Sequence, residues 1–193
     1  KENQGKATGS DTVLCFATLK SDSWVHPTYW IRFDEEIVDR DHLEEALTRI
    51  LVDETLDTAL KSIDKDRLTW SEKFKDDGYL FWAEKQFLPG VTDNLSNTIE
   101  EALRLMSISS TVSVTSGATY LISEPQLSAW EVKTPEQIVE YASYNLFHPL
   151  VERFCVYDLN DLTGKEESLL TFSKVSLTEA RKPKSIDLNI SDR

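Results

Sequence analysis

The side chains that could carry acid–base or metal chemistry are scattered along this sequence. Its three histidines have no cysteine or carboxylate near them at metal-ligand spacing, and none lies in an HExxH pattern; they are His26, His42 and His148. Short acidic clusters could pair as acid and base or hold a divalent cation, but solvated loops and helix caps explain them better; they are Asp34-Glu-Glu36, Asp39-Arg-Asp41 and Asp64-Lys-Asp66. We therefore expect no catalytic residue and no metal site, and structural or surface roles for the histidines.

Nucleophile motifs and phosphate-binding loops are also missing from the sequence. There is no G-x-S-x-G elbow, and neither Cys15 nor Cys155 lies between small residues as a glutaminase nucleophile would. The glycines are isolated apart from one Pro-Gly turn, so no glycine-rich loop could hold a nucleotide. We expect no cofactor-binding residue in this segment. Both cysteines lie in apolar, strand-like runs, which indicates packing in a reducing compartment rather than a disulfide.

The composition is that of an acidic chain able to fold. With 193 residues, 40% of them hydrophobic, it can bury the core of one large or two small domains. The net charge is -13 and no Lys/Arg cluster could follow a phosphate backbone, so nucleic acid is not an expected partner. No apolar run approaches the roughly 20 residues of a membrane span and no signal peptide opens the chain, so we expect a cytoplasmic protein without a membrane partner. Because the chain starts at Lys1 without methionine and stops in a charged segment at Arg193, we expect a piece of a longer polypeptide.

The elements that must position these residues follow from hydrophobic periodicity. Residues 1–10 contain almost nothing that could be buried, which predicts a flexible lead. β-Branched and aromatic residues predict strands at Thr12–Leu19 and Thr28–Val38. Helical spacing then predicts an amphipathic helix from Asp41, with Asp41 as its N-cap, and a second helical piece near Glu54–Ser62.

In the second half, strand and helix signals alternate. A strand is predicted at Tyr79–Leu88, followed by a Pro-Gly turn and a helix. That helix is indicated by capping residues Asp93, Asn94 and Ser96 and by an apolar stripe of Ile99, Ala102, Leu103 and Met106. Thr111–Ile122 alternates around Gly117, which predicts a hairpin or one bent long strand. Thr134-Pro-Glu-Gln137 predicts a helix start, His148-Pro149 its end, and Leu150–Tyr157 a last strand.

Three segments, in order, carry a resemblance to a known family. They are Leu88-Pro-Gly-Val-Thr-Asp93, Ser113-Val-Thr-Ser-Gly-Ala-Thr-Tyr-Leu-Ile122 and Asn145-Leu-Phe-His-Pro-Leu-Val-Glu-Arg153. The stretch from Tyr79 to Tyr157 resembles PurS, the small adaptor of phosphoribosylformylglycinamidine (FGAM) synthase, and equally the PurS-like region at the front of the larger PurL-type chains. Two departures are Asn94-Leu95-Ser96, where the family has a glycine or Pro-Gln-Gly, and His148, where it has asparagine.

The order strand, helix, two strands, helix, strand is typical of ferredoxin-like split βαβ units, and the resemblance implies the same fold. We expect an α+β protein in which a duplicated pair of PurS-like units packs helices on an antiparallel sheet. The predicted division is a lead at residues 1–10, a partial PurS-like half at 11–78, a second half at 79–157, and a linker toward a synthetase body at 158–193.

The resemblance implies a non-catalytic part of FGAM synthase, the ligase that uses ATP and glutamine to convert formylglycinamide ribonucleotide (FGAR) to FGAM in purine biosynthesis. Its role would be to organise the contact and ammonia transfer between glutaminase and synthetase, which would be its partners; ATP and Mg are expected in the parent enzyme only. Candidate interface residues at the family's turns are Pro89, Gly90, Val91, Thr92, Asp93, Asn94, Pro149 and Glu152. The sequence also leaves open a homodimer formed through the sheet. The alternative is a stand-alone ferredoxin-like module that binds a small ligand or regulates an enzyme.

Overall fold

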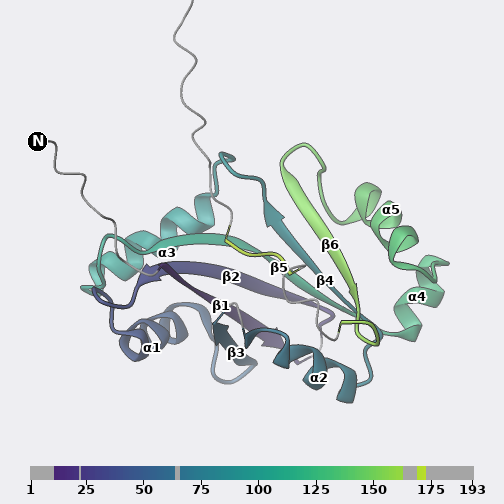
Figure 1. The fold of residues 1–193 in the computed structure, drawn as a ribbon, viewed down its shortest axis with the longest axis horizontal. Helices are drawn as coiled ribbons and strands as arrows, with labels where there is room; N and C mark the ends of the chain where they lie inside the picture. Colours follow the sequence, from purple (N-terminus) through teal and green to yellow (C-terminus); the bar gives the residue numbers. More distant parts are fainter. Residues whose placement is uncertain (1–10, 22, 64–65, 163–168, 173–193) are drawn as a thin grey trace, which may run out of the picture.

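One six-stranded antiparallel sheet organises the described part of the protein. The computed structural model describes residues 11–21, 23–63, 66–162 and 169–172 (Figure 1). The strands, in the order β3-β1-β2-β5-β4-β6 across the sheet, are β1 Asp11–Lys20, β2 Val25–Asp34, β3 Asp57–Ile63, β4 Phe81–Phe87, β5 Ser113–Ile122 and β6 Glu152–Asp158. The helices are α1 Arg40–Leu51, α2 Thr69–Asp76, α3 Asn94–Leu105, α4 Glu124–Trp130 and α5 Pro135–Asn145.

The strand order repeats one arrangement twice. β2 and β3 flank β1 and run parallel to each other, and α1 connects them. β5 and β6 flank β4 in the same way, and α4 and α5 connect them. Each set is a split βαβ unit, and the two units meet at the antiparallel β2–β5 pair. The predicted fold class, α+β with duplicated split βαβ units that pack helices on an antiparallel sheet, is confirmed.

The predicted division into halves falls between α2 and β4, inside this continuous sheet. The predicted lead lies outside the described residues. Of the predicted linker, the structure describes residues 158–162 and 169–172, and both pieces contribute buried leucines to a core.

Four helices cover one face of the sheet, because alternate strand residues on that face are apolar. Over β1 and β2 this core includes Phe16 and Ile31 and is closed by α1 and α3. Over β4, β5 and β6 it includes Ala83 and Tyr120 and is closed by α4 and α5, which lie together at the right of Figure 1. These residues are largely removed from water, which is the main favourable contribution to folding.

The opposite face is covered by α2 and by chain that follows β6. Trp30 of β2 and Trp82 of β4 are fully buried there. α2 contributes Trp70 and Phe74 to the same cluster, and residues after β6 contribute Leu159, Leu162, Leu169 and Leu170. Because both faces of the sheet are covered, side chains of both alternating sets along β4 are buried.

The segment around Gly117 forms one long strand, which is the second of the two predicted alternatives. β5 pairs with β2 on one side and β4 on the other. A Cβ atom at Gly117 would lie 2.0 Å from the carbonyl oxygen of Lys85 and 2.9 Å from the indole ring of Trp30. Glycine is therefore required here because backbone and indole approach closely.

Two predictions in the first half are wrong. Glu54–Ser62 is not helical; most of it belongs to β3, which pairs with β1 and follows a turn in which Asp53 accepts the Thr55 N–H at 3.0 Å. In so short a segment, pairing with β1 overrides the helical spacing of its apolar residues. The N-cap of α1 is Asp39 rather than Asp41, because the Asp39 carboxylate accepts the N–H of His42 at 2.8 Å. Helices α2 and α4 were not predicted.

Candidate functional site

The eight predicted interface residues lie on or directly beside two turns at one end of β4. Six belong to the segment between β4 and the start of α3, and Pro149 and Glu152 belong to the segment between α5 and β6. We call residues 88–93 the first turn and residues 148–152 the second turn. The N–H of Leu88 donates a hydrogen bond to the carbonyl oxygen of Val151 at 2.9 Å. The structure therefore brings together two segments of the family resemblance that are about 60 residues apart in the chain.

The first turn depends on the backbone of Gly90. Its φ of 85° lies in the left-handed region, and the Val91 N–H closes the turn on the carbonyl oxygen of Leu88 at 3.2 Å. A Cβ atom at Gly90 would meet nothing within 4 Å, so the requirement for glycine here is conformational rather than steric crowding by neighbours.

Asp93 ends the first turn and holds it to the sheet. Its carboxylate accepts hydrogen bonds from the N–H of Ser96 at 3.0 Å and the N–H of Ser116 at 2.8 Å, and from both serine hydroxyls. Burial by itself would raise the pKa of Asp93, but these bonds from Ser96 and Ser116 outweigh it and lower the pKa. Asp93 therefore stays ionised, caps α3 and satisfies a backbone N–H of β5 beyond the end of β4.

Glu100 of α3 makes a similar contact two residues earlier in β5, because its side chain accepts the N–H of Val114 at 2.7 Å. Together the carboxylates of Asp93 and Glu100 fix α3 along the part of β5 that β4 does not reach. Their role is structural.

Glu152 builds the second turn. One of its carboxylate oxygens accepts the N–H of His148 at 2.8 Å, and the other lies 3.2 Å from the ammonium of Lys85 in β4. Lys85 in turn donates to the carbonyl oxygen of Leu146 at 3.3 Å. The second turn is thus held to β4 by an ion pair as well as by the bond from Leu88.

Large apolar side chains are exposed to solvent on the second turn and beside the first turn. Leu150 is 79% exposed and Val151 36% exposed on the second turn, and Leu95 is 50% exposed at the start of α3. Pro89, Gly90 and Pro149 are also exposed. Beside the first turn is a cavity of about 340 Å³, lined partly by Thr92, Asp93 and Asn97. Turns held by hydrogen bonds, with exposed apolar side chains, are suited to contact with another protein surface.

The structure does not bring the other candidate groups together. His26 lies in β2, His42 in α1 and His148 on the second turn. His26 is buried and its Nδ1 accepts the N–H of Lys20 at 3.1 Å; burial is the main reason that its pKa falls to about 4, although Asp57 opposes this. Among the described residues, no group of three or more His, Cys, Asp or Glu side chains could hold a metal ion. Asp64 of the third acidic cluster lies outside the described residues.

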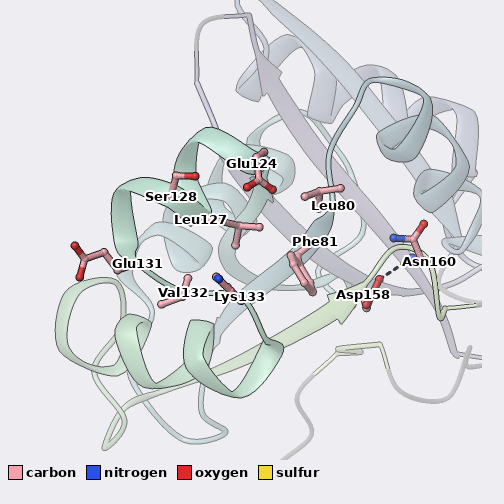
Figure 2. A pocket seen from close by; sticks show the side chains of 10 residues that line it. All are labelled: Leu80, Phe81, Glu124, Leu127, Ser128, Glu131, Val132, Lys133, Asp158 and Asn160. Atoms are coloured by element: carbon pink, nitrogen blue, oxygen red, sulfur yellow. Dashed lines mark hydrogen bonds between the residues drawn. The ribbon is translucent and has the colours of Figure 1, made fainter.

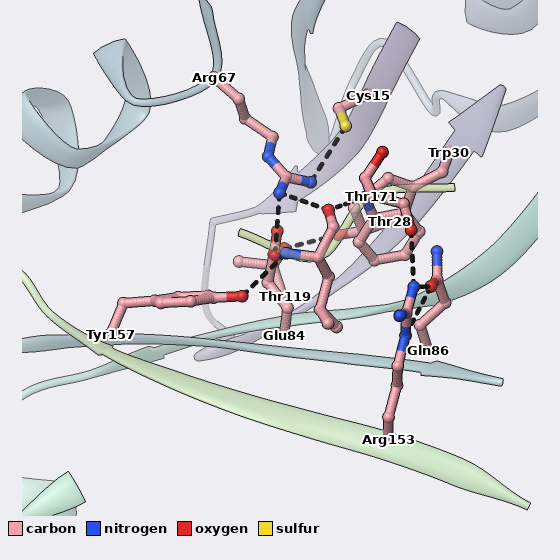
Figure 3. Close-up of polar contacts among 11 residues, drawn as sticks. Cys15, Thr28, Trp30, Arg67, Glu84, Gln86, Thr119, Arg153, Tyr157 and Thr171 are labelled. Carbon is pink, nitrogen blue, oxygen red and sulfur yellow. Dashed lines mark hydrogen bonds and ion pairs between the residues drawn. The ribbon is translucent and has the colours of Figure 1, made fainter. Parts of the chain in front are cut away.

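Two features were missed by the sequence analysis. At the other end of β4, a cavity of about 630 Å³ opens between β4, α4 and the end of β6 (Figure 2). On the face covered by α2, Arg67 and Glu84 are fully buried, with Arg67 Nη2 3.3 Å from Glu84 Oε2 (Figure 3). The sequence contained one signal for this cluster: strand alternation places the polar residues Glu84 and Gln86 on the same face as Trp82. Both faces of that strand, β4, are buried.

Comparisons of the chain with family models, with curated proteins and with solved structures found no match.

Within the described part of the chain, none of the helices has both the length and the apolar character needed to cross a membrane.

Proposed function

We propose that this chain is the PurS-like part of an FGAM synthase and that the surface formed by its two turns contacts the glutaminase or synthetase unit. One observation carries the proposal: the two motif-bearing turns lie side by side at one end of β4, joined by the Leu88–Val151 hydrogen bond of 2.9 Å. The duplicated split βαβ sheet is the fold that the resemblance implies, and it supports the proposal further.

The proposed contribution to the reaction is geometric. Asp93 and Glu152, which would be the obvious acid–base candidates of the two turns, are engaged in holding those turns in place. Exposed apolar side chains such as Leu150 are then presented at a defined position. In the parent enzyme such a surface would fix the relative position of two active sites, so that ammonia released by one reaches the other without escaping to water.

Deletion of the coding segment in its own host tests the proposal. We expect the deletion strain to require an added purine base, and we expect the wild-type segment supplied on a plasmid to remove that requirement. A strain that grows without purines, and that retains full FGAM synthase activity in extracts, contradicts the proposal.

A second candidate function, a stand-alone module that binds a small ligand, is favoured by the cavity of about 630 Å³. Its lining combines apolar Phe81 and Leu127 with carboxylates of Glu124 and Asp158 and the ammonium of Lys133 (Figure 2). Groups of both charges beside apolar surface suit a zwitterionic ligand such as an amino acid. Calorimetric titration with individual amino acids tests this: saturable binding at one site per chain that Lys133→Ala abolishes favours this function, and no binding removes it.

A further inference from the structure

The face of the sheet covered by α2 contains side chains that recognise main-chain atoms, and residues 169–172, which we call the strap, occupy that site (Figure 3). The carbonyl oxygen of Leu170 accepts a hydrogen bond from Trp30 Nε1 at 3.0 Å and one from Arg67 Nη2. The N–H of Leu170 donates to the hydroxyl oxygen of Tyr157 at 2.9 Å. The carbonyl oxygen of Thr171 accepts from Arg153 Nη2 at 2.6 Å.

Three main-chain groups of the adjacent residues Leu170 and Thr171 are therefore bound by side chains from separate parts of the fold. Trp30 belongs to β2, Tyr157 and Arg153 to β6, and Arg67 to the segment before α2. None of these bonds uses an atom of a strap side chain, so this part of the recognition is independent of strap sequence.

Apolar contacts add a sequence preference. Leu169 and Leu170 are buried among the aromatic residues of this face, including Trp30 and Trp82. Phe172 packs against the same cluster, and the guanidinium carbon of Arg32 lies 4.8 Å from the centre of its ring. The ligand that fits this groove is a peptide with two adjacent leucines and an aromatic residue two positions later.

A buried ion pair lies beneath the strap. Arg67 contacts the strap directly and pairs with Glu84, and both side chains are 0% exposed. Burial of such a pair carries a large desolvation cost. Release of the strap would admit water to Arg67 and Glu84, and their hydration would offset part of the apolar burial that is lost.

We propose that the strap is a releasable internal ligand, and that the groove beneath it is a binding site for a peptide of the pattern Leu-Leu-x-Phe. In the resting chain the occupant is residues 169–172 of the same molecule. This inference is independent of the function proposed above, because the strap and the two turns have no residue in common.

Hydrogen exchange on the unmodified full chain tests whether the strap is released. The amide of Leu170 is expected to exchange at least about tenfold faster than that of Ala83 in β4, through an opening that leaves the sheet folded. Exchange of both amides at the same rate, with the same denaturant dependence, would mean that the strap leaves only on global unfolding, and would overturn the proposal.

Peptide binding tests the groove. The probe is the fluorescein-labelled peptide Ser-Leu-Leu-Thr-Phe-Ser, which has the sequence of residues 168–173, and the receptor is the full chain carrying Leu170→Pro. Proline has no N–H to donate to Tyr157, so the internal strap competes less well. We expect this variant to bind the probe at least about tenfold more tightly than the wild-type chain does.

Two controls distinguish the groove from non-specific apolar binding. Tyr157→Phe in the Leu170→Pro background keeps the ring and removes the acceptor, and should weaken binding about five- to tenfold. A probe N-methylated at its second leucine should lose a similar factor. Failure of a folded Leu170→Pro chain to bind the probe, or binding that neither control weakens, would overturn the proposal.

Discussion

Asp93 and Ser116 are 23 residues apart in sequence, yet the carboxylate of Asp93 accepts both the N–H of Ser116 at 2.8 Å and its hydroxyl at 3.0 Å. The Asp93 side chain thereby supplies a hydrogen-bond acceptor to β5 at the point where its pairing with β4 ends. Replacing Asp93 should affect both the cap of α3 and this part of β5.

Asp93→Asn is expected to lower the free energy of unfolding by about 2 kcal/mol at pH 7, because the amide accepts fewer and weaker bonds than the carboxylate. The folded-state pKa of Asp93 is lowered, so its contribution is present above the unfolded-state value near 3.8 and is lost as the pH falls through the folded-state pKa. The difference between wild type and variant, measured by urea unfolding, should therefore shrink below about pH 4. A difference that grows in acid would contradict this.

The buried His26 should make the protein less stable in mildly acidic solution. Its pKa is about 4 in the folded chain against 6.5 ordinarily, so between these values the unfolded chain binds a proton that the folded chain does not. Stability should therefore fall as the pH is lowered from 6.5 to 4. His26→Gln should reduce that slope of unfolding free energy against pH.

Gly90→Ala tests the left-handed backbone conformation of the first turn. Alanine at a φ of 85° should cost about 1 to 2 kcal/mol of unfolding free energy. Gly78→Ala is a matched control, since Gly78 has a φ of 88° and equally open surroundings. Both variants should lose similar stability in thermal unfolding. A neutral Gly90→Ala beside a destabilised Gly78→Ala would show that the first turn does not need this conformation.

Gly117→Ala should be far more damaging than either, because the added methyl group would overlap the Lys85 carbonyl and the Trp30 ring. We expect a loss of about 3 kcal/mol or more, or no soluble folded protein at all. Circular dichroism and urea unfolding would measure this. Wild-type stability in Gly117→Ala would contradict the close packing of β5 between β2 and β4.

Local signals in the sequence predicted the features that depend on neighbouring residues. Asp93 caps α3 as predicted, and Thr134 forms the predicted capping box with Gln137. Both depend only on residues within one turn of helix. The strand character of β3 was missed because pairing with β1, rather than its own short sequence, decides its conformation.

Features that depend on strand order could not be predicted in this way. The sequence gives no measure of the distance between Leu88 and Val151, which the placement of β6 beside β4 makes neighbours. Residues 169–172, the strap, were predicted to belong to a linker. Trp30 and Tyr157 bind main-chain atoms of the strap, and contacts to the main chain leave little pattern in a sequence.

The most direct test of the proposed adaptor role compares two nitrogen sources in the FGAM synthase of which we propose this chain to be a part. Leu150→Asp places a charge at the exposed apolar point of the second turn, and Leu105→Asp places one at a position of α3 that is 78% exposed and at the helix end away from the turns. We predict that Leu150→Asp lowers glutamine-dependent FGAM formation by about tenfold or more and leaves ammonia-dependent formation within about twofold of wild type, while Leu105→Asp changes neither. Equal losses with both nitrogen sources, or no loss with Leu150→Asp, would contradict the proposed role of this surface in joining glutaminase and synthetase.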